Sequence, residues 1–161
     1  MFQSILEDHP KLQVERDDND NYIVAIPLAV ETNDQRLVNL VCEIEPFVLD
    51  EEETFQFLYS IQIIALNDDF EPFETMESAI ARPYIPNDIR DRIVDLVLDS
   101  VRLLVVKIPM SKIYMVAKEG KLPDKAFKKH ARLIETFEEL GFYLDIEGYD
   151  PSGRRVWTLR R

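Results

Sequence analysis

Carboxylates are the residues of this sequence whose spacing most suggests chemistry or binding. Two dense groups stand in the N-terminal half, and their members are Asp17, Asp18 and Asp20, then Asp50, Glu51, Glu52 and Glu53. The first group lacks the central glycine and the twelfth-position glutamate of a calcium loop, so a solvated turn is predicted there. Glu43 and Glu45 lie two apart, which on a strand places both on one face, where an acid and a base could act together.

Other catalytic groups are sparse. The single cysteine, Cys42, cannot form an internal disulfide and is expected to be a buried thiol in a reduced compartment. His9 and His130 stand alone in separate segments, and His130 is expected to face solvent beside Lys128 and Lys129. No serine stands in a nucleophile motif. The sequence therefore predicts no catalytic residue, no cofactor and no metal site.

Charge divides the chain into unlike halves. Residues 1–80 hold 19 Asp and Glu against 3 Lys and Arg, whereas residues 81–161 hold 12 against 16, for a net charge of −12. An acidic half repels phosphate, which argues against nucleic acid and favours a basic protein as partner. The two carboxylate groups are the predicted partner-binding residues. The lysines and arginines of the second half also make a second copy of the chain a candidate partner.

Length and hydropathy favour one domain over residues 1–161. No apolar run reaches the roughly 20 residues that a membrane-spanning helix needs. The N-terminus has no basic stretch before an apolar core, so a cytoplasmic protein without a secretory signal is expected.

The first half predicts strands. A short helix is expected over residues 2–9, a first strand over 12–16 and a turn over 17–21, and alternating apolar residues predict strands over 22–30, 37–47 and 55–66. Val38, Leu40, Cys42 and Ile44 are expected on the core side of the second of these three. Residues 67–86 contain three prolines and are expected to be irregular.

The second half predicts helices between strands. Apolar residues at steps of three and four predict a long helix over about 87–106, with Asn87 as its N-cap, and a second over about 123–140, ended by Gly141. Strands are expected over 112–117, 142–147 and 154–159, the last two as a hairpin. Trp157, Tyr143 and Tyr149 are expected to pack across that hairpin, or to anchor an interface if exposed. The fold class is α+β, with a mostly antiparallel sheet of six to seven strands.

This order of elements, three strands, helix, strand, helix and two strands, resembles the core of GNAT-type acetyltransferases. The local likeness is at Phe137, Gly141 and Phe142, where that family ends a helix in Tyr-x-x-x-Gly-Phe. The resemblance implies a coenzyme A site at the start of the long helix and a tyrosine general acid. Residues 82–90, however, contain no glycine and two prolines, Asp88 and Asp91 would repel the pyrophosphate, and Phe137 has no proton to donate.

Three hypotheses follow. The sequence favours a non-enzymatic domain that acts through protein–protein contacts. The alternatives are a diverged acyl-CoA-dependent N-acetyltransferase and a binding module like a secretion chaperone.

Overall fold

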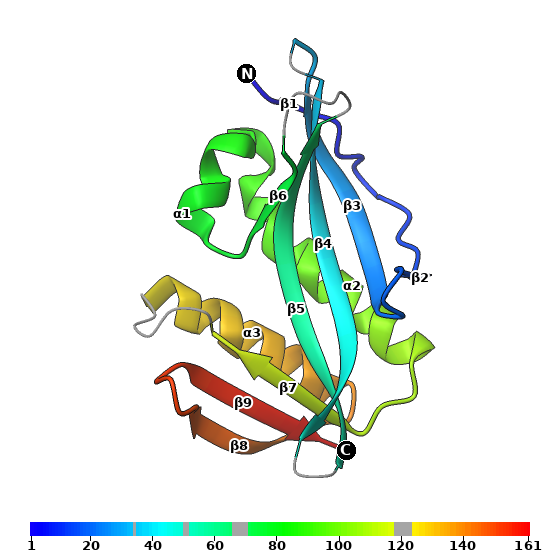
Figure 1. The fold of residues 1–161 in the computed structure, drawn as a ribbon, viewed down its shortest axis with the longest axis vertical. Helices are drawn as coiled ribbons and strands as arrows, with labels where there is room; N and C mark the ends of the chain where they lie inside the picture. The colour runs from blue at the N-terminus through cyan, green and yellow to red at the C-terminus, as the bar shows by residue number, and fades with distance from the viewer. Residues whose placement is uncertain (34, 50–51, 66–70, 118–123) are drawn as a thin grey trace.

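The computed structural model of this chain describes residues 1–33, 35–49, 52–65, 71–117 and 124–161 (Figure 1). The strands are β1 Gln3–Ser4, β2 Glu15–Arg16, β3 Tyr22–Glu31, β4 Arg36–Leu49, β5 Glu52–Ala65, β6 Phe73–Thr75, β7 Lys112–Val116, β8 Tyr143–Tyr149 and β9 Arg155–Arg160. The helices are α1 Ser78–Ala81, α2 Ile93–Lys107 and α3 Asp124–Glu139, with short 3₁₀ helices η1 Arg82–Tyr84 and η2 Asn87–Arg92. The α+β class is confirmed.

All described strands belong to one sheet, ordered β1-β3-β4-β5-β7-β9-β8, with β2 also on β3 and β6 also on β5. These nine strands exceed the six or seven expected, because the short strands β1, β2 and β6 pair along the edges of longer ones. Among the described strands only β5 and β7 pair in parallel, and they share two residue pairs, Phe55 with Ile113 and Gln56 with Tyr114. Beyond them the two strands diverge, so the sheet has a long-stranded part and a C-terminal part (Figure 1).

The long strands β3, β4 and β5 form the predicted antiparallel meander. Their alternation of side chains determines which face is apolar, because successive residues of a strand point to opposite faces. The expected core row of β4 is confirmed, and its members Val38, Leu40, Cys42 and Ile44 are all buried. Helix α2 packs on this face, where Leu96, Val101 and Leu104 are buried. Figure 1 shows α2 crossing behind the three strands.

The long helix occupies the predicted place but begins differently. Its first six residues form the 3₁₀ helix η2, and α2 continues from Ile93 to Lys107. The prediction of Asn87 as N-cap is wrong: Pro86 holds that position, without a side-chain cap. Arg90 secures the turn instead, because its guanidinium donates to the carbonyl oxygens of Ile85 at 3.0 Å and Arg82 at 2.9 Å.

Helix α3 ends where the sequence predicted. Gly141 follows it with a φ of 96°, a left-handed conformation that glycine adopts without strain. The Phe142 N–H then donates to the Phe137 carbonyl at 3.0 Å, which turns the chain into β8. No helix in the described part of the chain is long and apolar enough to cross a membrane.

The N-terminal segment departs from its prediction, because no helix forms over residues 2–9. Gln3 and Ser4 pair with Val30 and Ala29 of β3, and the Ile5 N–H donates to the Leu28 carbonyl at 3.0 Å. A helix of so few residues is marginal by itself, whereas the edge of β3 offers unpaired backbone groups. The strand expected over 12–16 shortens to β2, Glu15–Arg16.

The proline-containing segment is more regular than expected. Residues 71–86 include β6, α1 and η1, and β6 pairs with β5 from Ile61 to Ile63. The Glu77 N–H donates to the Thr75 hydroxyl at 3.1 Å at the turn into α1. Prolines 72 and 83 stand at positions that need no ladder hydrogen bond, so they do not prevent this order.

The C-terminal hairpin is confirmed as β8 and β9. Asp150 builds its turn, since one carboxylate oxygen accepts from the backbone N–H of Ser152 at 3.0 Å and of Arg154 at 2.9 Å. Gly153 supplies the positive φ of 82° that this turn requires.

Phe137 offers the sharpest test of this core. Its ring is fully buried and meets Phe57 and Phe142 edge-on, at centroid distances of 6.0 and 5.6 Å. We expect Phe137→Ala to lower the free energy of unfolding by about 3–5 kcal/mol, since it deletes a buried ring and leaves a cavity. Urea denaturation followed by circular dichroism measures this change. The control Val106→Ala, at a side chain that is 76% exposed, should change it by less than about 0.5 kcal/mol.

Candidate functional site

The meander has a second face that no described helix covers. Figure 1 views the molecule from this side, with β3, β4 and β5 in front and α2 behind them. We call it the open face. By strand alternation it consists of Ile23, Ala25 and Pro27 of β3, Leu37, Asn39, Val41, Glu43 and Glu45 of β4, and Gln56, Leu58, Ser60, Gln62 and Ile64 of β5.

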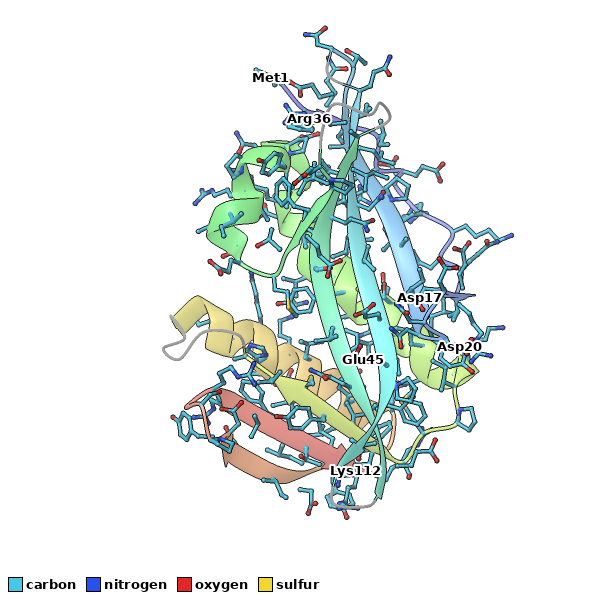
Figure 2. All side chains as sticks on the ribbon, viewed as in Figure 1. Met1, Asp17, Asp20, Arg36, Glu45 and Lys112 are labelled. Carbon is cyan, nitrogen blue, oxygen red and sulfur yellow. The ribbon has the colours of Figure 1, made fainter. Side chains whose placement is uncertain are left out.

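Carboxylates crowd one end of the open face. Burial raises the pKa of Glu43 above its ordinary value, and the negative charges of Glu45, Glu74 and Asp17 raise it further. These four groups come from β4, β6 and the turn before β3, so the fold gathers them from distant parts of the sequence. Figure 2 shows Glu45 over the strands and Asp17 beside the end of β3. The cluster is an uncompensated concentration of negative charge that a cation would relieve.

Apolar side chains adjoin this cluster. Ile23 and Leu58 flank Glu43 in register on the two neighbouring strands, and Val41 follows on β4. All three are half-buried rather than covered. Toward the other end, Leu37 and Ile64 pair across β4 and β5 and are likewise half-buried. The two kinds of side chain are interspersed on the open face, since Glu43 lies between Ile23 and Leu58, and Glu74 pairs with Gln62 beside Asn39.

The first predicted carboxylate group partly joins this cluster. Asp17 faces its own turn, where one carboxylate oxygen accepts from the N–H groups of Asn19 and Asn21, both at 2.9 Å, and its charge also reaches Glu43. The predicted turn is confirmed. Asp18 and Asp20 are exposed, and Asp20 lies 3.8 Å from Arg16.

The second predicted group lies elsewhere. Asp50 and Glu51 fall outside the described residues, Glu52 begins β5, and Glu53 is exposed. The hairpin pair Leu49–Glu52 is five residues beyond Ile44, which pairs with Tyr22, or about 16 Å along the strand. The structure thus separates the two predicted groups. Sequence reasoning noted Glu43 and Glu45 as a pair but missed Glu74, whose proximity depends on β6 pairing with β5.

The basic residues of the second half are largely engaged within the chain. Arg132 pairs with Asp95 at 2.7 Å, Arg154 with Asp150 at 2.8 Å and Arg160 with Asp145 at 2.7 Å, while Arg155 pairs with Glu147. Lys118 and Lys121 lie outside the described residues. A guanidinium with a carboxylate beside it offers less net charge to a phosphate, so these arginines do not form the free positive stripe typical of a nucleic-acid surface.

His130 does not face solvent as expected. Its ring stacks on the indole of Trp157 at a centroid distance of 4.4 Å, and its Nδ1 is buried with no hydrogen-bond partner among the described residues. Burial lowers the pKa of His130, and the positive charges of Lys129 and Arg155 lower it further.

Among the aromatic residues of the hairpin, Trp157 is buried, whereas Tyr143 and Tyr149 are 56% and 65% exposed. The hairpin aromatics therefore divide between core and surface.

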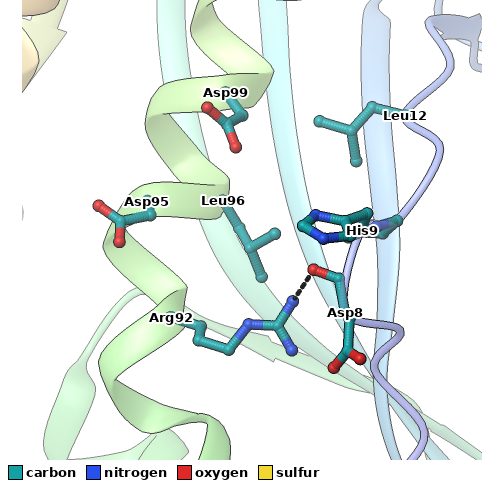
Figure 3. A pocket seen from close by; sticks show the side chains of 8 residues that line it. Asp8, His9, Leu12, Arg92, Asp95, Leu96 and Asp99 are labelled. Atoms are coloured by element: carbon teal, nitrogen blue, oxygen red, sulfur yellow. Dashed lines mark hydrogen bonds between the residues drawn. The ribbon is translucent and has the colours of Figure 1, made fainter.

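A pocket of about 320 Å³ opens between the N-terminal segment and α2 (Figure 3). Its lining residues are Asp8, His9, Pro10, Leu12, Arg92, Asp95, Leu96 and Asp99. Arg92 donates to the carbonyl oxygens of Glu7 at 2.7 Å and Asp8 at 3.0 Å, and so ties the segment to the helix. Asp95 and Asp99 already pair with Arg132 and Arg102.

In the described ranges no three His, Cys, Asp or Glu residues converge as metal ligands.

Glu43 should make stability depend on pH. A carboxyl whose pKa is raised in the folded state binds protons more tightly there than in the unfolded chain, so it lowers stability as pH rises through its pKa. We expect Glu43→Gln to raise stability at pH 7 by about 0.5 kcal/mol after solvent screening, or about 1–2 °C in melting temperature. The gain should vanish below pH 4. Thermal melting over this range measures it, and Glu135→Gln, at an exposed site on α3, should show no such pH-dependent gain.

Cys42 should be inert in the folded protein. Burial raises the pKa of its thiol to about 12 from 9.0, against a smaller opposing effect of the Ser100 hydroxyl. The thiolate population at pH 8 is then about a thousandfold lower than for a free thiol, and access is blocked as well. Reaction with an aromatic disulfide reagent should be at least a thousandfold slower than in 6 M guanidinium. Rapid reaction of the native protein would contradict the packing of β4 against α2.

A search of protein-family models, curated proteins and solved structures finds no match to this chain. Its function must therefore be inferred from its own residues.

Proposed function

We propose that this protein is a non-enzymatic binding domain that contacts a basic protein partner through the carboxylates of the open face. One observation carries the proposal. Glu43 and Glu45 lie on a sheet face without a described helix layer, where burial raises the pKa of Glu43 and the negative charges of Glu45, Glu74 and Asp17 raise it further. Clustered like charges lower the stability of the free protein, so a cationic partner gains binding energy by relieving their repulsion.

The distribution of charge over the chain supports this direction. The arginines of α3 and the hairpin have carboxylate partners within the chain, whereas Glu43, Glu45 and Glu74 form no ion pair with a described residue. A net charge of −12 also produces a long-range field that speeds the approach of a basic protein. Asp18, Asp20 and Glu53, exposed around the same strands, would add to that steering.

The alternative is a diverged acyl-CoA-dependent N-acetyltransferase. It is favoured by the order of the longer elements, β3-β4-β5-α2-β7-α3-β8-β9. Against it, Phe137 is fully buried between two other rings and carries no hydroxyl to serve as general acid. The entry to the long helix has Pro86 at its N-cap and Asp88 in its first turn, a poor setting for a pyrophosphate.

A matched pair of triple variants tests the proposed function. Glu43→Gln, Glu45→Gln and Glu74→Gln remove three charges from the open face, and Asp91→Asn, Glu135→Gln and Glu138→Gln remove three exposed charges from the helices. A partner isolated on the wild-type protein is purified, and its dissociation constant is measured for all three proteins. We expect the open-face variant to bind at least tenfold more weakly and the helix variant to bind within twofold of wild type.

Two further measurements can contradict the proposal: the salt dependence of partner binding and thermal melting with acetyl-coenzyme A. Raising salt from 0.15 to 0.5 M shortens the screening length from about 8 to about 4 Å and should weaken wild-type binding strongly. Equal binding by both variants, insensitive to salt, would refute the proposal. Acetyl-coenzyme A at about a hundred times a dissociation constant plausible for such enzymes should leave the melting temperature unchanged. A stabilisation of about 2.7 kcal/mol would instead establish the acetyltransferase alternative.

A further inference from the structure

We propose that the contact between His130 of α3 and Trp157 of β9 is a pH-sensitive latch. The neutral imidazole holds the first half of α3 on the sheet, and protonation of the imidazole releases it. The latch is independent of the proposed function, because Trp157 pairs with Met115 of β7 and so lies on the face opposite the open face. The neighbouring residue of β7, Tyr114, is the one that pairs with Gln56 of the open face.

The latch joins α3 to the C-terminal part of the sheet, along which the helix lies (Figure 1). The imidazole of His130 stacks on the indole of Trp157 with a centroid distance of 4.4 Å and an interplanar angle of 24°. His130 stands three residues before Leu133 and seven before Phe137, and both of these are buried. The three side chains therefore form one stripe of the helix, in which His130 is the first contact.

The surroundings of Nδ1 favour the neutral ring of His130. Nδ1 is buried and has no hydrogen-bond partner among the described residues. In the neutral tautomer with its proton on Nε2, Nδ1 carries only a lone pair, and its burial costs less than the burial of a charge. A protonated ring has an N–H donor on each nitrogen. Nδ1–H would then be a charged donor without an acceptor in the described part of the chain, which carries the full cost of its desolvation.

The charges around His130 also oppose protonation. Besides burial, the positive charges of Lys129 on α3 and Arg155 on β9 lower its pKa. On β8, Glu147 pairs with Arg155, and the Tyr149 hydroxyl accepts from the same guanidinium at 3.3 Å. The paired residue of β7 is an uncharged methionine. The carboxylate that the hairpin offers on this face is therefore already engaged by an arginine.

Attraction between an imidazolium and the indole is the effect that competes with the latch. A cation over the face of a tryptophan ring is attracted by the ring quadrupole. The guanidinium of Arg155 already lies over Trp157, with its central carbon 5.7 Å from the ring centroid. A second cation on the same indole is repelled by the first. Burial and this repulsion outweigh the attraction, because the pKa of His130 is lowered rather than raised.

The remaining contacts of α3 make the opening local. Helix α2 packs on α3 through Asp95, which pairs with Arg132 at 2.7 Å, and through Arg102, which lies 4.0 Å from Glu139. None of these pairs involves His130, and the buried Leu133 and Phe137 hold the second half of the helix. Release of the latch therefore loosens the first half of α3 without unfolding the protein.

The direction of the pH effect follows from proton linkage. The folded state binds a proton at His130 less tightly than the unfolded chain, in which histidine titrates near pH 6.5. The latch thus contributes its full stability above that pH and loses it as the pH falls below. Opening exposes the imidazole to water, so the open form gains population at acidic pH.

Trp157 is the single tryptophan of the chain, so its fluorescence reports on the latch without interference. The experiment follows Trp157 emission and the NMR chemical shifts of the His130 ring in the full chain from pH 8 to pH 5. We expect His130 to titrate below pH 6.5. We also expect the emission of Trp157 to move to longer wavelength with the same midpoint, because an indole that becomes exposed to water emits at longer wavelength.

Matched histidine variants and hydrogen exchange locate the effect. His130→Phe keeps a ring against Trp157 but cannot take a proton, whereas His9→Phe removes the other histidine of the chain, which is exposed. We expect the first variant to abolish the emission shift and the second to retain it. In the wild type, protection factors of the amides of residues 129–133 should fall at least threefold from pH 7.5 to 5.5, and those of residues 96–101 by less than twofold.

A charge variant tests the latch without changing either ring. Lys129→Gln removes one of the two cations that act on His130 and should raise the pH of the midpoint. Lys128→Gln removes a charge from the neighbouring exposed position and should raise the midpoint less.

Three outcomes would overturn the latch. If His130 titrates above pH 6.5, attraction to the indole prevails over burial. If it titrates below pH 6.5 while the emission wavelength and the protection of α3 stay constant, the ring takes its proton in place and nothing opens. If His130→Phe retains the pH dependence of the wild type, another group causes it. The binding test of the open face uses other residues, so its result is separate from each of these.

Discussion

The pairing of β4 on both of its edges is the constraint on which the rest of this structure depends. β3 and β5 hold it in register from Arg36 to Ile44, and β5 continues to Leu49. Because successive side chains alternate, a slip of one residue would send Cys42 and Leu40 to solvent and Glu43 into the core. The register that buries the apolar row under α2 therefore also places the carboxylates on the opposite face. Core formation and the candidate site have one common cause.

Burial of the apolar β4 row against α2 stabilises that register. The β4 core row and the helix residues Leu96, Val101 and Leu104 are all nearly or fully buried, and removing such side chains from water is the main favourable term in folding. The Ser100 hydroxyl, also buried here, donates to the Leu96 carbonyl at 2.8 Å, so the interface contains a polar group without a large penalty. No described helix packs on the opposite face, where Asn39 and Ser60 are buried and the other side chains are half-buried or exposed.

Electrostatics divides the molecule in the same way as packing does. In the C-terminal part of the sheet, Asp145, Glu147 and Asp150 each pair with an arginine of β9 or its turn, and those pairs lie close in sequence. At the meander, burial raises the pKa of Glu43 and the neighbouring carboxylates Glu45, Glu74 and Asp17 raise it further. A protein that neutralises one region and concentrates charge in another presents one preferred side to a cationic molecule.

The sequence by itself determined the local elements of this protein. Period-two alternation predicted β3, β4 and β5 with their core sides, period-3.6 stripes predicted the two long helices, and Gly141 and Asp150 to Gly153 predicted a helix end and a turn. These features depend on interactions within a few residues, so they can be read from neighbouring side chains.

Tertiary structure decided the remaining features. The N-terminal segment is extended because it pairs with the edge of β3. His130 is partly buried because its ring stacks on Trp157. Glu74 lies near Glu43 because β6 pairs with β5. Each of these outcomes joins residues more than 20 positions apart, where proximity follows from the path of the whole chain and not from local preference.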